Sequence, residues 1–246
     1  MIPYRTAAVT GASGGIGRAI VTELVRLGMH VHALALDDDA LEVLRAGDGV
    51  TVHAVDVRDT AALRRVLDDV GDVDVLVNNA GVIGDLLPAQ RSTVAIADAL
   101  IDINLRAAVH ATMTLLPGMV GRDLGHIFFT GSIAASRPTA NSAVYSATKA
   151  ALQAFADGLR MDLHGAAVRV TVLAPGRVET NLYDTAMGGH EVAVARLYSG
   201  APAIQPADIA VLVGTVLTMP APVDVTRLEV VPTLQVFGGS AVAEPS

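Results

Sequence analysis

Apolar positions along the chain follow two alternating patterns, short β-rich runs and longer amphipathic segments. The short runs predict strands at residues 6–10, 31–36, 51–55, 73–77, 126–130, 168–174 and 227–231. The amphipathic segments predict helices at 16–27, near 39–44, and at 60–70, 93–116, 143–164 and 206–217. Asp59 or Thr60 is suited to cap the third helix, and Pro117 is expected to follow the end of the fourth.

Strands and helices that alternate in this order predict an α/β fold, with about seven strands in one doubly wound parallel sheet and helices on both faces. The strands are almost wholly apolar, as expected where both sheet faces are buried. No linker or internal repeat divides the chain, so residues 1–246 are expected to form a single domain. Residues 181–204 form the least regular internal segment, with Gly188, Gly189, Gly200 and Pro202, and predict a substrate lid. Residues 238–246 predict a flexible tail.

Composition narrows the class of protein. A chain of 246 residues with 52% hydrophobic and 17% charged residues can bury a large core, which excludes a disordered protein. The net charge of −8 makes nucleic acid and anionic membrane surfaces poor partners. With no cysteine, disulfides and thiol nucleophiles are excluded, and the seven histidines have no metal-ligand spacing, so no metal is expected. No signal peptide or membrane-spanning run is visible, which makes a cytoplasmic protein the default expectation.

The use of basic residues singles out one position. Of the 17 basic residues, all but Lys149 are arginine. A retained lysine indicates a site where a guanidinium cannot replace an ammonium, although drift in composition is the alternative. Tyr145 lies four residues earlier, so both side chains would share one face of a helix. A cation beside a phenol favours the phenolate and so prepares the phenol for proton transfer, which favours a functional role for the pair.

A glycine-rich turn directly follows the first predicted strand. Such a turn lets the backbone approach a pyrophosphate, which lies at the positive end of the next helix. A turn without a ligand is the alternative, but the position between a buried strand and a helix favours nucleotide binding. The expected contacts are Gly11, Ser13, Gly15, Ile16 and Gly17.

The spacing of Gly11, Gly15 and Gly17 departs from GxGxxG and resembles the TGxxxGxG turn of the short-chain dehydrogenase/reductase family. The NNAG sequence at 78–81 and the YxxxK sequence at 145–149 resemble further elements of that family. The resemblance implies a Rossmann-type fold. It also implies cofactor contacts at Asp56 and Val57 for the adenine, and at Asn79, Ala80, Gly81, Tyr145, Lys149, Pro175, Gly176, Val178 and Thr180.

The same resemblance implies a catalytic tetrad of Asn104, Ser132, Tyr145 and Lys149. In it, Tyr145 exchanges a proton with the substrate oxygen that Ser132 holds. Lys149 lowers the pKa of Tyr145 and binds the nicotinamide ribose, and Asn104 holds a water linked to the lysine. Taken alone, Ser132 would be an ordinary turn residue and Asn104 a solvated or locally bonded helix residue.

The end of the second strand bears on the choice between NAD(H) and NADP(H). An acid there accepts hydrogen bonds from a free ribose 2′-hydroxyl, whereas an arginine accommodates a 2′-phosphate. Residues 35–39 are Ala-Leu-Asp-Asp-Asp, which favours NAD(H) with Asp37 as a contact; capping of the next helix is the alternative role for Asp38 and Asp39. Residues 226–233 instead resemble the branch containing 3-hydroxy acid and serine-type dehydrogenases, whose members often prefer NADP(H).

These observations predict an NAD(P)-dependent oxidoreductase that transfers a hydride between nicotinamide and the carbon of a carbonyl or secondary alcohol. One alternative is a ketoreductase for a carrier-bound 3-oxoacyl substrate, for which Arg91, Arg106 and Arg122 could form a basic patch. The other is a dinucleotide-binding redox regulator without catalysis, which the intact tetrad disfavours. Tyr183 and Tyr198 either line the substrate pocket or pack within the lid. The resemblance also implies a homo-oligomer, a tetramer or a dimer.

Overall fold

The computed structural model describes residues 2–36, 39–197 and 203–234. Its strands form one parallel sheet in the order β3-β2-β1-β4-β5-β6-β7, which confirms the predicted fold class. The strands are β1 (Thr6–Thr10), β2 (His30–Ala35), β3 (Val50–Ala54), β4 (Val75–Asn78), β5 (Gly125–Thr130), β6 (Val168–Pro175) and β7 (Arg227–Val230).

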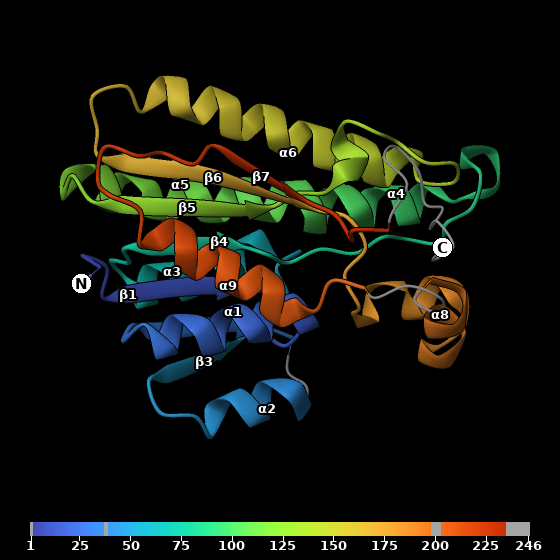
Figure 1. Ribbon diagram of the computed structural model, residues 1–246, viewed down its shortest axis with the longest axis horizontal. Coiled ribbons are helices and arrows are strands. Elements are labelled where there is room, and N and C mark those ends of the chain that lie inside the picture. Colours follow the sequence, from blue (N-terminus) through green and yellow to red (C-terminus); the bar gives the residue numbers. More distant parts are fainter. Residues whose placement is uncertain (1, 37–38, 198–202, 235–246) are drawn as a thin grey trace.

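Helices cover both faces of this sheet (Figure 1). On one face the apolar sides of α1 (Gly15–Arg26), α2 (Asp39–Arg45) and α9 (Pro206–Leu217) pack into one core. On the other face α3 (Thr60–Val70), α5 (Ala107–Gly121) and α6 (Ala143–Asp162) pack into a second core. Asp59 caps α3, because its carboxylate accepts hydrogen bonds from two backbone N–H groups of the first turn.

The strand order reverses between β1 and β4, where consecutive connections cross to opposite sides of the sheet. In a parallel sheet the crevice at such a reversal lies beyond the carboxyl ends of the strands and is where ligands bind. The glycine turn follows β1 and residues 78–81 end or follow β4, so both meet at this crevice.

The fourth predicted helix differs from the prediction in two ways. It is split into α4 (Val94–Ile101) and α5 by a π-helical turn (Asp102–Arg106), and α5 runs through Pro117 to Gly121. Proline removes one helical hydrogen bond, which leaves the carbonyl of residue 113 without its helical donor. Met113 is 66% exposed, so water can reach this turn and replace the lost bond.

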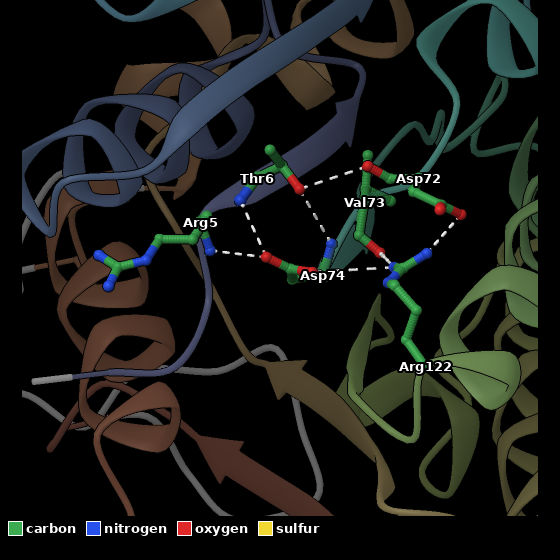
Figure 2. A network of polar contacts seen from close by, with 6 residues as sticks. All are labelled: Arg5, Thr6, Asp72, Val73, Asp74 and Arg122. Carbon is green, nitrogen blue, oxygen red and sulfur yellow. Dashed lines mark hydrogen bonds and ion pairs between the residues drawn. The ribbon is translucent and has the colours of Figure 1, made fainter.

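Polar contacts stabilise the end of the sheet opposite the crevice, where β1 and β4 begin (Figure 2). The carboxylate of Asp74 accepts hydrogen bonds from the backbone N–H groups of Arg5, at 2.7 Å, and Thr6, at 3.2 Å. Arg122 donates to the carbonyl of Val73 at 2.7 Å and pairs with Asp72. The Asp74 bonds hold the start of β1 against the start of β4, and the Arg122 contacts hold α5 against the residues before β4; none of them uses a residue of the crevice.

The predicted lid contains short helices in its described part. These are η4 (Asn181–Tyr183), α7 (Asp184–Met187) and α8 (His190–Leu197), and Figure 1 places α8 at the opposite end of the molecule from the N-terminus. Closure of this segment over a substrate stays a prediction, and the predicted tail at 238–246 lies outside the described residues. Among the residues that the structure describes, no helix has the length and apolarity needed to cross a membrane.

Candidate active site

A cavity of about 600 Å³ opens at the carboxyl ends of β1, β4, β5 and β6. Most of the residues predicted from the motifs line it. They are Gly11, Gly15, Ile16, Asn79, Ala80, Gly81, Ser132, Tyr145, Lys149, Pro175, Gly176, Val178 and Thr180. Of the other predicted residues, Ser13, Gly17, Asp56, Val57 and Asn104 do not line it, and Asp37 lies outside the described residues.

The glycine turn is packed so closely that side chains have no space. Gly11 has a φ of +63°, and a Cβ there would lie 2.8 Å from the Cα of Ala80. A Cβ on Gly17 would lie 2.1 Å from the carbonyl oxygen of Gly11, so only glycine fits this position, and its role as a cofactor contact stays a prediction. The N-cap of α1 is Gly14, which has no side chain to bind the first N–H groups, and the first turn carries no acid. These N–H groups and the positive helix end fit a pyrophosphate.

Asn79 connects the ends of three strands. Its amide nitrogen donates to the carbonyls of Thr10 and Gly11 at 3.2 and 3.1 Å, and its oxygen accepts from the Thr130 hydroxyl at 3.2 Å. The Thr10 hydroxyl in turn accepts from the backbone N–H groups of Asn79 and Ala80. The sequence prediction missed both threonines; their shared position, at the carboxyl ends of β1 and β5, was the signal that could have found them.

The predicted adenine contacts lie after β3 and apart from the cavity. Asp56 forms an ion pair with Arg58 at 2.5 Å, and this guanidinium lowers the pKa of the carboxyl group. Val57 is buried. The structure leaves their predicted role as adenine contacts untested.

Tyr145, Ser132 and Lys149 meet on one side of the cavity. Tyr145 lies in the first turn of α6 and Lys149 one turn later, and both are buried. The ammonium of Lys149 donates to the carbonyl of Thr130 at 2.7 Å and lies 5.8 Å from the centre of the Tyr145 ring. Ser132 follows β5, and its hydroxyl oxygen accepts from the N–H of Ala134 at 3.1 Å.

The protonation of this group differs from the prediction. Burial raises the pKa of Tyr145 above its ordinary value; the nearby Tyr183 raises it further, and a hydrogen bond with Ser132 opposes the rise. Burial lowers the pKa of Lys149 to about 8. The net shift of the Tyr145 pKa is upward, because desolvation of the phenolate is the largest effect on it.

Asn104 lies behind the cavity wall in the π-helical turn and is 1% exposed, which excludes the solvated helix residue considered above. Its side-chain oxygen accepts from the N–H of Val82 at 2.8 Å, and its nitrogen donates to the Val82 carbonyl and the Thr148 hydroxyl. A Cβ on Gly81 would lie 3.4 Å from both Asn104 Oδ1 and Lys149 Nζ, so these two polar atoms flank Gly81. The structure leaves the predicted link through a water untested.

The segment after β6 closes over the glycine turn. A Cβ on Gly15 would lie 3.1 Å from the Thr180 methyl group, and the Thr180 hydroxyl accepts from the N–H of Leu182. The wall beyond this segment was mostly missed from the sequence, because its residues carry no motif. It consists of Val82, Ile83, Gly84, Asp85, Ile96, Ala99, Leu100, Asn181, Leu182 and Tyr183.

This wall and its surroundings bear on two alternatives from the sequence. Tyr183 lines the cavity, whereas Tyr198 lies outside the described residues. Arg106 forms an ion pair with Asp102 at 2.5 Å. Arg122 is bound at the end of the sheet opposite the cavity (Figure 2). None of Arg91, Arg106 and Arg122 lines the cavity, and Arg122 lies at the other end of the sheet, so the three do not form one patch there.

Comparisons with known proteins agree with this geometry. A family model described as short chain dehydrogenase matches residues 5–188. An uncharacterized short-chain type dehydrogenase/reductase, y4eK of Sinorhizobium fredii, is 48% identical over 99% of this chain and 97% of its own. The NADP-dependent 3-hydroxy acid dehydrogenase YdfG of Escherichia coli is 37% identical over 94% of this chain and 96% of its own.

A solved structure of the closed form of serine dehydrogenase complexed with NADP+ has a TM-score of 0.91 at 36% identity, covering 98% of this chain and 100% of that one. The matches extend over nearly the whole sequence, and the glycine turn, the NNAG segment and the buried Tyr145 and Lys149 lie together at one crevice. The chain belongs to the short-chain dehydrogenase/reductase family of oxidoreductases.

Proposed function

We propose that this protein interconverts a carbonyl compound and the corresponding secondary alcohol with a nicotinamide dinucleotide, and that Tyr145 is its general acid and base. The observation that carries the proposal is the convergence of Tyr145, Ser132 and Lys149 on one cavity beside the uncapped end of α1. The dinucleotide would lie along the glycine turn and supply or accept the hydride when bound.

The side chains of the cavity would handle the proton and the substrate oxygen. Ser132 and Tyr145 would both hydrogen-bond this oxygen, which keeps the reacting carbon in place. Tyr145 would give its proton to the oxygen during reduction and take it back during oxidation. The charge of Lys149, held in place by the Thr130 carbonyl, would stabilise the phenolate that forms when the proton leaves. Asn104 would position Gly81 and Val82 beside this lysine.

The residues of this chain and the names of its relatives favour different dinucleotides. Relatives named NADP-dependent support NADP(H). The acids at 37–39 and the lack of arginine at 35–39 support NAD(H), because a 2′-phosphate beside these carboxylates would be repelled. Arg58, the nearby cation after β3, is already paired with Asp56. On this argument from the chain itself we propose NAD(H), and the parallel assay below decides.

The test is an absorbance assay at 340 nm with NADH and NADPH in parallel, against aryl ketones, diketones, β-keto esters and 3-hydroxy acids. Tyr145→Phe is expected to lower kcat by roughly a thousandfold while cofactor binding persists, since only the proton donor is removed. Tyr4→Phe is the matched control, because Tyr4 is a buried tyrosine bound to Arg169 and does not line the cavity.

Each outcome has a clear meaning. Turnover with NADH that is lost in Tyr145→Phe and kept in Tyr4→Phe supports both parts of the proposal. Turnover with NADPH alone keeps the catalytic role and overturns the choice of NAD(H). Cofactor binding with no turnover on any substrate would instead favour the redox regulator.

A further inference from the structure

The part of the cavity that faces away from the glycine turn is apolar. Ile83 and Leu100 are buried there, and Ile96, Leu182 and Tyr183 pack against them together with Tyr145. A substrate bound beside Tyr145 would place its larger substituent against these side chains. Burial of apolar surface would then supply much of its binding free energy.

Asp85 brings a negative charge to this apolar wall. One carboxylate oxygen accepts from the N–H of Leu87 at 3.2 Å, and the other accepts from the Ser92 hydroxyl at 2.9 Å. Both donors are neutral, and within the described part of the chain Asp85 forms no ion pair. The next residue, Leu86, has a φ of +50°, in the left-handed region that residues other than glycine seldom adopt. The carboxylate is thus held at the cavity without a compensating charge.

The described lining of the cavity has few positive charges that could bind an anionic substrate. Among the described residues that line it, the charged ones are Lys149 and Asp85, and no arginine is present. The ammonium of Lys149 is bound to the Thr130 carbonyl, on the side of the glycine turn and β5. A carboxylate buried here would lose its water without gaining a bidentate partner.

We infer that this cavity selects uncharged carbonyl compounds and secondary alcohols with an apolar substituent, and that Asp85 excludes carboxylate substrates by charge repulsion. The inference rests on the proposed function and names its substrate class. It separates this chain from the relatives whose name gives 3-hydroxy acids as substrates. Repulsion of a competing ligand is a common source of specificity, alongside attraction of the right one.

The test compares two substrates that differ in charge and in one methyl group, 3-hydroxyhexanoate and its methyl ester, oxidised at pH 7.5 with the preferred cofactor. In the wild-type protein we expect kcat/KM for the ester to exceed that for the acid by about a hundredfold, since one repulsion and one desolvation oppose the acid. Asp85→Asn keeps an oxygen for the Leu87 N–H and removes the charge. It should reduce this ratio roughly tenfold, mainly by raising kcat/KM for the acid.

Ser92→Ala is the matched control, because it removes a hydrogen bond of Asp85 and keeps the charge. It should leave the ratio near the wild-type value. Equal kcat/KM for acid and ester in the wild type, or an unchanged ratio in Asp85→Asn, overturns the inference and leaves the proposed function standing. Oxidation of the acid alone also overturns it. Failure of the wild type to convert any ketone or alcohol, with cofactor still bound, overturns the proposed function itself.

Discussion

At the scale of single residues, the site places ionisable groups where water is scarce. Lys149 is 4% exposed and Tyr145 is 8% exposed. Burial lowers the pKa of Lys149 and raises that of Tyr145, so it favours the neutral form of each side chain. A buried ammonium costs folding free energy, which the bond to the Thr130 carbonyl offsets only in part. The arrangement is therefore expected to favour activity at the expense of stability.

Replacement of this lysine by an apolar residue of similar length tests the cost. The pKa of Lys149 is lowered to about 8 from its unfolded value of 10.5, so between these values the unfolded state binds more protons and stability rises with pH. At pH 7, Lys149→Met should unfold at a higher urea concentration than the wild type. Its free energy of unfolding should be larger by about 1–2 kcal/mol, after the loss of the Thr130 bond is taken into account. The advantage should shrink toward pH 10, and a variant less stable at pH 7 would contradict the argument.

At the scale of elements, irregular backbone brings the functional side chains to the crevice. The π-helical turn between α4 and α5 directs Asn104 into the protein, where it binds both backbone groups of Val82. The glycine turn before α1 likewise depends on backbone packing that a side chain would prevent.

Two glycines within helices should respond in opposite ways to the same substitution. A Cβ on Gly17 would meet the Gly11 carbonyl, whereas one on Gly158, exposed in α6, meets nothing within 4 Å. Gly158→Ala should stabilise the protein by up to about 1 kcal/mol, because alanine favours a helix. Gly17→Ala should destabilise it by several times as much and weaken cofactor binding. Urea unfolding and a cofactor titration check both, and equal effects would contradict the packing argument.

At the scale of the whole molecule, the sheet was predictable because buried parallel strands leave a strong apolar signal. The glycine turn and the Tyr145–Lys149 pair could also be found, since their chemistry restricts residue type. The π-helical turn and the continuation of α5 through Pro117 could not, because both depend on tertiary contacts and solvent access. The direction of the Tyr145 pKa shift could not either, since sequence spacing gives the nearby cation and not the degree of burial.

Histidines of the sheet should make the folded protein sensitive to acid. The rings of His32 and His53, on β2 and β3, are hydrogen-bonded at 3.1 Å, and His30 lies beside His32. Burial lowers the pKa of His32 to about 4, helped by both neighbouring histidines, and lowers that of His53 against the influence of Asp69. Between pH 6.5 and about 4 the unfolded state therefore binds more protons, and stability falls as the pH falls.

Urea unfolding at pH 7.5 and pH 5 measures this loss. His32→Gln should reduce the loss by about 1 kcal/mol, a value discounted for the partial exposure of the ring. His110→Gln, at an exposed position of α5, is the control and should leave the loss unchanged. A loss of the same size in His32→Gln and in the wild type would assign the acid sensitivity to other groups.

Because Lys149 is the only lysine in the sequence, its side-chain amine can be modified selectively. An acylating reagent directed at amines has one side chain to modify in the whole chain, and this amine lies inside the cavity. With a pKa of about 8, much of it is the reactive free base in mildly alkaline buffer. The rate of modification, followed by the mass of the peptide that contains Lys149 so that reaction at an α-amino group is not counted, would then report how often the cavity admits a small molecule. Any compound that fills the cavity would slow it.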